Sequence, residues 1–332
     1  MTRARGYTLI ELMIAVGLFG LIASGALSLV MSASRSQAYS ARADVAQSGL
    51  RAGIDFITRD LTGASGGAST GAIVDSSGAV PVVVSGVKVT QGVNAPDILE
   101  VYTIDASTMA YVMAPFAPTT PILSIDKPLS FVNGDFVLLS DPSLAFAVVL
   151  KFTANGAVNN SACTGCGDLS VFNATNTFPA TAPSPFPIKS WVFKSRHVIY
   201  KILTLVGAGP GANGSYLTMS LNGGADQPLA EGIEDMQIAL GFDNNPTDGV
   251  ITQNGASAND DEWVGNVSGE VVPANLALLR AVRVTLVAKA TMAQPGTFYP
   301  GRPTAEDHAA AAPDGFPRRL VRSVISVRNL SL

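Results

Sequence analysis

One carboxylate, Glu11, stands at the start of a long apolar run, shortly after the dipeptide Gly6 and Tyr7. No residue between Leu12 and Ser34 carries a charge. A carboxylate inside lipid is disfavoured by about 2.5 to 3.5 kcal/mol at mid-membrane, and by less near an edge, so it is retained only where a partner or an interface compensates it. We therefore expect a partner or an interface to compensate Glu11, and we do not expect it to belong to an active site.

The chain has two cysteines, Cys163 and Cys166, separated by two residues. That spacing permits a disulfide, half of a metal site or a redox pair. Zinc would need two further ligands, and the nearest histidine in the sequence, His197, is remote; a redox pair would need a strand and a helix around it. In an oxidising compartment we expect a loop disulfide, which stabilises the fold by about 2 kcal/mol.

A cluster of oxygen-bearing side chains follows a predicted strand and includes Asp243, Asn245 and Asp248. Because calcium binds roughly six to eight oxygens, these three residues are candidates for part of a calcium shell. The segment lacks the glycine and the terminal glutamate of an EF-hand loop. The alternative is a plain turn, which is the more frequent role of such clusters. Calcium is the one cofactor that the sequence suggests.

The two histidines, His197 and His308, have no catalytic setting in the sequence. No nucleophile elbow, phosphate loop or metal-ligand spacing accompanies them, and catalysis usually requires a polar constellation with a base. We expect His197 at a strand edge, His308 in a solvated loop, and no enzymatic activity. The formal net charge of -4 argues against nucleic acid as a partner.

The uncharged run is the first half of a predicted long helix. At about 1.5 Å per residue it is long enough to cross a hydrocarbon core of about 30 Å. Arg3 and Arg5 precede the run, so the positive-inside rule places everything after Ser34 outside the cytoplasm. A cleaved secretory signal and a plain signal anchor are the alternatives, but a secretory signal needs a shorter core and a small-residue cleavage site, which Met31-Ser32-Ala33 supplies poorly.

The helical period continues beyond the apolar run as a stripe with charges opposite it. The stripe consists of Tyr39, Ala43, Ala46, Leu50, Ile54, Ile57 and Leu61. On the other face, Arg51, Asp55 and Arg59 have the four-residue spacing that supports a helix. We predict one helix from about Leu9 to about Thr62, ended by Gly63 and the glycines that follow.

Beyond the helix, the period of two and the many Gly, Asn and Pro residues predict strands and turns. The predicted strands are 80–89, 98–104, 109–113, 136–139, 145–152, 198–205, 216–221, 236–242, 281–288 and 320–327, with 105–107 as a hairpin loop. We predict an α+β fold in which a long amino-terminal helix packs on an antiparallel β-sheet, with an enlarged β-rich carboxy-terminal region.

The amino terminus resembles the class III signal of type IV prepilins and type II secretion pseudopilins, because a basic leader ends at Gly6, an aromatic residue follows, and Glu11 is the fifth residue after that point. The family usually has Phe where this chain has Tyr7. The resemblance implies that a prepilin peptidase cleaves between Gly6 and Tyr7 and methylates the new amino terminus. It also implies that Glu11 pairs with that amine on a neighbouring subunit.

Three later segments, 49–61, 229–243 and 327–330, resemble PilW-type minor pilins. The resemblance implies a structural subunit that primes assembly and sits at the pilus tip, with other minor pilins, the major pilin and the inner-membrane assembly platform as partners. Its further associations are twitching motility and cell adhesion. A J-type pseudopilin of type II secretion and a tip adhesin are the alternatives.

These expectations divide the chain into four parts. Residues 1–6 are a leader peptide, 7–34 the transmembrane half of the helix and 35–62 its amphipathic half. Residues 63–332 are a β-rich globular domain, for which a division into two lobes is one of the arrangements that the sequence allows. The expected location is the inner membrane, crossed once with the amino terminus cytoplasmic and the large domain periplasmic, and then the pilus tip at the cell surface.

Overall fold

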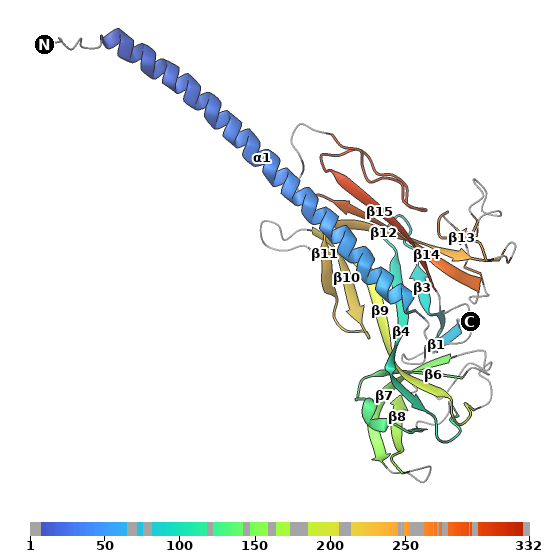
Figure 1. Ribbon diagram of the computed structural model, residues 1–332. Helices are drawn as coiled ribbons and strands as arrows, with labels where there is room; N and C mark the ends of the chain where they lie inside the picture. Colours follow the sequence, from blue (N-terminus) through green and yellow to red (C-terminus); the bar gives the residue numbers. More distant parts are fainter. Residues whose placement is uncertain are drawn as a thin grey trace.

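The structure is a computed structural model that describes most of the chain. The described residues are 8–64, 72–75, 82–117, 122–141, 147–158, 164–172, 185–205, 214–244, 247, 249–252, 262–267, 269–270, 272–273, 278–291, 293 and 298–327. They form one long helix and a β-rich head at its carboxy-terminal end (Figure 1).

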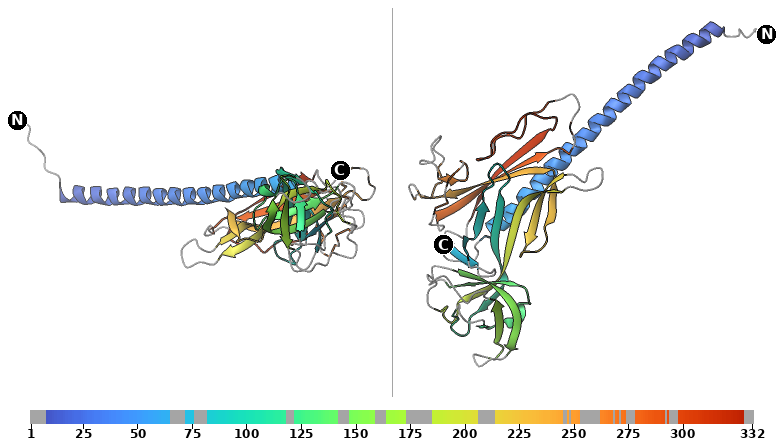
Figure 2. Two further views of the ribbon diagram at one scale, coloured as in Figure 1. Left: turned by 90° about the horizontal axis from the view of Figure 1, so that it is seen from below. Right: turned by 180° about the vertical axis from the view of Figure 1, so that it is seen from behind.

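The helix α1 runs over Leu9–Thr62, with the bounds that the sequence predicts. Its 54 residues span about 80 Å at about 1.5 Å per residue. The amino-terminal half projects freely away from the head, whereas the other half lies along it (Figures 1 and 2). At the far end Gly63 has φ -90° and ψ -1°, so it stops the helix in a right-handed conformation and not in the left-handed one that usually selects glycine there.

The strands form two sheets, and nearly all pairs are antiparallel. The bounds are β1 (Ala72–Asp75), β2 (Val82–Ser85), β3 (Val87–Thr90), β4 (Ile98–Tyr111), β5 (Ile122–Ile125), β6 (Phe136–Ser140), β7 (Ala147–Val158), β8 (Gly167–Phe172), β9 (Trp191–Leu205), β10 (Gly214–Leu221), β11 (Gln227–Glu231), β12 (Ile233–Phe242), β13 (Trp263–Val264), β14 (Leu279–Lys289) and β15 (Arg318–Ser326). A short 3-10 helix, η1 (Pro128–Ser130), precedes β6. The predicted α+β fold, with a long helix on antiparallel sheet, is confirmed.

The larger sheet contains β1 to β11 along the path β11-β10-β9-β6-β7-β1-β2, with β3, β4, β5 and β8 joined at its sides. Its one parallel pair is β1 with β7. The smaller sheet has the order β13-β12-β14-β15. The predicted segments 198–205, 216–221, 236–242 and 281–288 fall within strands of these two sheets, and 320–327 falls on the edge strand β15, which ends at Ser326.

The described residues form two large hydrophobic cores and two small clusters. The first joins the stripe of α1 to both sheets and includes Leu50, Ile57, Tyr200, Leu217 and Leu286. The second lies away from the helix, in the lobe that the end of β4 builds with β5 to β8 (Figure 1). Its buried apolar side chains include Val112, Phe116, Leu123, Phe131, Phe152 and Phe186. We call this second unit the distal lobe.

The helix packs closely on the sheets at Gly53. A Cβ at this position would lie 2.8 Å from Leu217 Cδ2 and 3.1 Å from Leu286 Cδ1. Those distances are shorter than a carbon–carbon contact of about 3.5 to 4 Å. Glycine therefore favours the close approach of α1 here, since a larger residue would push two leucine methyl groups aside, and it costs about 1 kcal/mol in helix propensity.

The predicted hairpin at 105–107 is wrong. Strand β4 continues through it as one strand, and β9 pairs with β4 both before and after, with a register shift between Asp105 and Ala110. The extra residues bulge out because their polar groups bond to one another: Asp105 Oδ1 accepts from Ser107 N at 3.0 Å, and Thr108 Oγ1 donates to Asp105 O at 2.7 Å. A second bond, from Lys194 N to Thr108 Oγ1 at 2.8 Å, ties the bulge to β9.

Candidate assembly site

The charged end of α1 is closed by a reciprocal pair of residues, Thr8 and Glu11. Thr8 is the N-cap, and its Oγ1 accepts a hydrogen bond from Glu11 N at 3.3 Å. In return, Glu11 Oε2 accepts from Thr8 N at 2.9 Å and from Thr8 Oγ1 at 3.0 Å. This is a capping box, and it satisfies two of the backbone and side-chain donors at the start of the helix.

The capping box sets the chemistry of the carboxylate. Glu11 lies in the first turn, where the positive end of the helix dipole favours a negative charge. Its second oxygen, Oε1, accepts no hydrogen bond from the part of the chain that the structure describes. That oxygen is therefore available to a cation from outside this helix. Gly6 and Tyr7, the predicted cleavage and methylation residues, lie outside the described residues.

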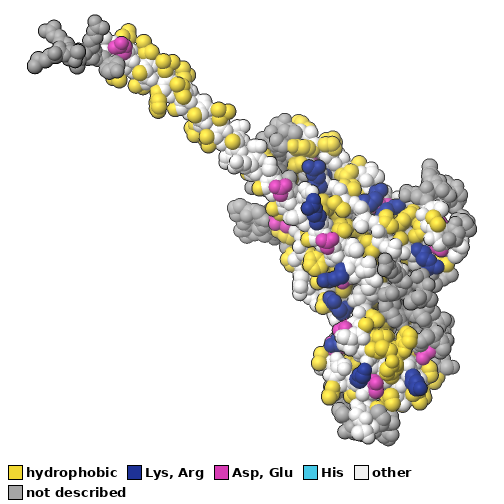
Figure 3. Space-filling model, viewed as in Figure 1, with side chains coloured by type: hydrophobic (Ala, Val, Ile, Leu, Met, Phe, Trp, Pro, Cys, Tyr) yellow, Lys and Arg dark blue, Asp and Glu magenta, His cyan; other side chains and the backbone are white. Residues whose placement is uncertain are grey.

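The helix beyond Glu11 presents apolar side chains to its surroundings on all sides. None of its most apolar 18-residue window is buried within the structure. Residues such as Leu9, Phe19, Leu21, Ile22 and Leu29 are each more than two-thirds exposed, and Figure 3 shows the corresponding yellow surface along the projecting helix. By length and composition this segment can cross a membrane. A surface of this kind is stable in lipid or against other apolar helices, not in water.

The second half of α1 holds the head rigidly. Leu50, Ile57 and Leu61 are fully buried, and Ala46 is the first buried residue among the side chains of the helix that the structure describes. Toward solvent, the predicted ion pairs between Arg51, Asp55 and Arg59 do not form; Arg59 instead contacts Asp60 at 3.2 Å and lies over the ring of Phe56. The buried apolar stripe seats most of this half of the helix on the sheets.

The last turn of α1 is fixed by a buried hydrogen bond. Tyr200 in β9 donates its hydroxyl proton to Asp60 Oδ2 at 2.6 Å, and both side chains are buried. Burial and the adjacent carboxylate raise the pKa of Tyr200 above its usual range, so the phenol keeps its proton. The bond transmits any force on α1 directly to a central strand of the head. This pair is not predictable from the sequence, because Asp60 and Tyr200 are 140 residues apart.

The predicted disulfide lies at the edge of the described structure. Cys166 is disulfide-bonded and buried. Its predicted partner, Cys163, is the chain's other cysteine but lies outside the described residues. The bonded residue comes directly before β8, so the ring would tie the loop between β7 and β8 in the distal lobe.

The predicted calcium ligands are described only in part. Asp243 is buried, accepts a hydrogen bond from Gly249 N at 3.1 Å and faces Arg280 Nε at 3.6 Å. Asn245 and Asp248 lie outside the described residues. Among the residues that are described, no three His, Cys, Asp or Glu side chains are grouped so as to hold a metal. The arginine already balances part of the charge of Asp243, and calcium binding here stays a prediction.

Both expectations for the histidines are wrong. His197 lies in β9, which is an interior strand, stacks on Tyr102 at 4.4 Å and contacts Glu100 Oε2 through Nε2 at 3.0 Å. The hydrogen bonds from His197 and Lys88 lower the pKa of Glu100 to about 2.

His308 is buried rather than solvated. Its Nδ1 lies 2.9 Å from Asp235 Oδ2, and Arg302 contacts the same carboxylate oxygen at 2.8 Å. Because Asp235 is itself fully buried, it needs these partners. His308 thus pins the segment before β15 to the smaller sheet. Its surroundings are structural ion pairs, not a catalytic group facing a substrate.

Taken together, the free apolar helix, the capped carboxylate at its start and the rigidly attached β-rich head define a type IV pilin-like protein. Comparison with known families agrees: residues 1–27 match the prokaryotic N-terminal methylation motif. Residues 208–329 match the Type IV pilus-assembly protein W family, PilW. The chain therefore carries the prokaryotic N-terminal methylation motif and, over its carboxy-terminal part, a match to the PilW pilus-assembly domain.

The PilW match covers the region from β10 to β15, which includes the sheet on which α1 lies, and it leaves the distal lobe outside. A solved structure of a type IV-like pilin from Thermus thermophilus is similar to this chain, with 15% sequence identity and a TM-score of 0.24. The similarity covers 60% of this chain and 86% of that one. Comparison with curated proteins gives no match.

Proposed function

We propose that this protein is a minor pilin of a type IV pilus that primes assembly and sits at the pilus tip, with a structural and not a catalytic role. The observation that carries the proposal is the bare apolar half of α1 with a single carboxylate, Glu11, at its start. Such a helix needs lipid or other helices around it, and its one charge needs a cation.

The proposed assembly step uses the free oxygen of Glu11. After a prepilin peptidase has cut between Gly6 and Tyr7, the methylated amine of Tyr7 on a neighbouring subunit is the cation that pairs with Glu11. The capping box keeps the carboxylate at the end of the helix with Oε1 open, so pairing does not require the helix to unwind. The pair compensates both charges inside the apolar core and fixes the register between neighbouring helices.

The shape of the head supports a place at the tip. The distal lobe extends beyond the carboxy-terminal end of α1, on the side opposite the free helix (Figures 1 and 2). A subunit stacked above would need that space, whereas subunits below would contact only the helix and the side of the head. The first subunit of a filament has nothing above it, and priming is the role of a first subunit.

Deletion of the gene that encodes this chain tests priming. We expect far fewer pili per cell by electron microscopy while the major pilin remains at its normal level in the inner membrane. Normal numbers of pili in the deletion strain would contradict priming. Gold labelling of a tagged, complementing chain should then mark filament ends; labels spread along the shaft would contradict the tip location.

Two alternatives are separated by further experiments. Co-purification from detergent-solubilised membranes should recover other minor pilins and the assembly platform, whereas recovery of secretion components would favour a J-type pseudopilin. Deletion of residues 173–184, which lie outside the described structure, separates adhesion from priming and leaves Phe186 of the distal-lobe core in place. Pili that form but do not adhere favour a tip adhesin, and loss of pili favours priming.

A further inference from the structure

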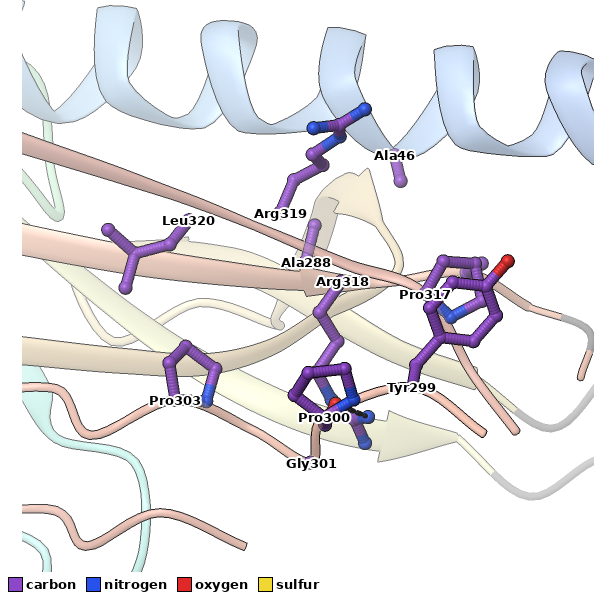
Figure 4. A pocket seen from close by; sticks show the side chains of 11 residues that line it. Ala46, Ala288, Tyr299, Pro300, Gly301, Pro303, Pro317, Arg318, Arg319 and Leu320 are labelled. Atoms are coloured by element: carbon purple, nitrogen blue, oxygen red, sulfur yellow. Dashed lines mark hydrogen bonds between the residues drawn. The ribbon is translucent and has the colours of Figure 1, made fainter. Parts of the chain in front are cut away.

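The head has an apolar hollow at the place where α1 leaves it. The hollow has a volume of about 430 Å³ and lies between the helix, the end of β14 and the start of β15. Tyr299, Pro300 and Leu320 line it, and the buried residue Ala46 of α1 forms its helical wall (Figure 4). Phe298, next to this lining, is 86% exposed. We call Phe298, Tyr299, Pro300, Arg319 and Leu320 the shoulder.

Arg319 is the shoulder's cation, and it remains available for an ion pair with a group outside this chain. Figure 4 shows its side chain pointing from β15 toward α1. Its neighbour Arg318 turns the other way and is held by Glu234 and Asp314. Lys289 shares the same two carboxylates. Arg319, by contrast, is exposed and forms no ion pair with any residue that the structure describes.

The shoulder faces the membrane-spanning half of the chain. Arg35 is the first charge after the apolar run, and the helix from Arg35 to Ala46 is about 16 Å long at about 1.5 Å per residue. A headgroup layer of about 5 to 8 Å covers part of that length. The tilt of about 20° that is usual for membrane helices brings one side of the head closer still.

We propose that the shoulder contacts the anionic phospholipid headgroups of the leaflet from which α1 emerges, and that this contact sets the tilt and rotation of the subunit before assembly. The inference rests on the proposed function only in requiring that α1 spans a membrane. Aromatic residues and arginine are the side chains that favour the headgroup region and orient membrane helices. Arg319 binds phosphate, while Phe298 and Tyr299 lie at the boundary with the acyl chains.

The contact is measured by fluorescence in the full-length chain. The variant Phe298→Trp is reconstituted into vesicles of phosphatidylglycerol and phosphatidylcholine with brominated acyl chains, and the signal of the parent, which has two tryptophans, is subtracted. The bromines should quench the new tryptophan. The matched control is Leu129→Trp at an exposed site of the distal lobe, which should not be quenched.

Charge dependence is tested with Arg319→Gln in the Phe298→Trp background. Loss of one arginine near an anionic surface is expected to weaken the contact about fivefold, and the difference should vanish in pure phosphatidylcholine. Lys151→Gln, an exposed cation of β7 in the distal lobe, is the matched control and should change nothing.

Equal quenching at positions 298 and 129 would overturn the proposal, as would equal effects of Arg319→Gln and Lys151→Gln. Protection of position 298 only when other pilins are added would also overturn it, because the shoulder would then be a protein interface. Resistance of the parent to carbonate extraction reports separately on membrane insertion. An inserted chain with an unquenched shoulder thus refutes this inference alone, and an extractable chain refutes the proposed function.

Discussion

The hydrogen bond between Tyr200 and Asp60 gives the sharpest prediction about how force on α1 reaches the head. Tyr200→Phe removes the hydroxyl alone and leaves the ring in the core. Asp60 then loses a 2.6 Å bond and keeps Arg59, whose side chain is 59% exposed, as its remaining side-chain contact. A hydrogen bond to a charged group contributes about 1.5 to 3 kcal/mol, so we expect the free energy of unfolding to fall by about 2 kcal/mol.

The assay is denaturant unfolding of the full chain in detergent, followed by the fluorescence of its tryptophans. Tyr216→Phe is the matched control, since Tyr216 lies on the neighbouring strand β10, is half-buried, and its hydroxyl has no recorded partner among the described residues. It should change the free energy of unfolding by less than about 0.5 kcal/mol. A double-mutant cycle with Asp60→Ala should give a coupling of about 2 kcal/mol between the two sites. No coupling, or equal effects of the two tyrosine variants, would refute the anchoring role.

Two further predictions concern the core and the pH dependence of stability. Leu50→Ala should destabilise the head by about 2 to 5 kcal/mol because Leu50 is fully buried, whereas Leu27→Ala, in the exposed half of the same helix, should leave unfolding of the head unchanged. The low pKa of Glu100, held at about 2 by His197 and Lys88, stabilises the fold above about pH 4.5, and this contribution is lost as the pH falls toward 2. At pH 7 the free energy of unfolding of Glu100→Gln should therefore be lower than that of the parent by about 1 to 2 kcal/mol, once solvent screening is allowed for. The two free energies, measured by denaturant unfolding, should converge at pH 2. A difference that stays constant with pH would contradict the assignment.

The helix was the most predictable element because several independent signals agree on it. Apolar composition, the stripe and the glycines gave its bounds, and the described structure has Leu9–Thr62. The spacing Thr8-x-x-Glu11 is also the sequence signal of a capping box, and the structure shows that box at the start of the helix. One carboxylate can have both roles, since Oε2 of Glu11 caps the helix and Oε1 stays available for pairing between subunits.

The strands were less predictable because their pairing is decided by distant residues. The polar segment at 105–107 has the composition of a turn, yet β9 pairs with β4 on both sides of it and converts it into a bulge. The short strands β1, β5, β8, β11 and β13 were missed, and the predicted strand 80–89 is two strands, β2 and β3, since a few residues carry too little periodicity. His308 looked solvated for a similar reason: the carboxylate that buries it, Asp235, is remote in the sequence.

The central claim is that Glu11 serves assembly, and the most direct measurement is the amount of Glu11→Ala protein in sheared filaments relative to membranes. The variant should insert normally, because it loses only a charge in the apolar segment. Its filament fraction should fall roughly fiftyfold, because the amine of Tyr7 on the neighbouring subunit would then lie unpaired in the apolar core, at a cost of about 2.5 kcal/mol. Thr8→Val, which keeps the carboxylate and loses the cap at about 1 kcal/mol, should fall by less than about tenfold. Entry of Glu11→Ala into filaments at the parental level would contradict the account.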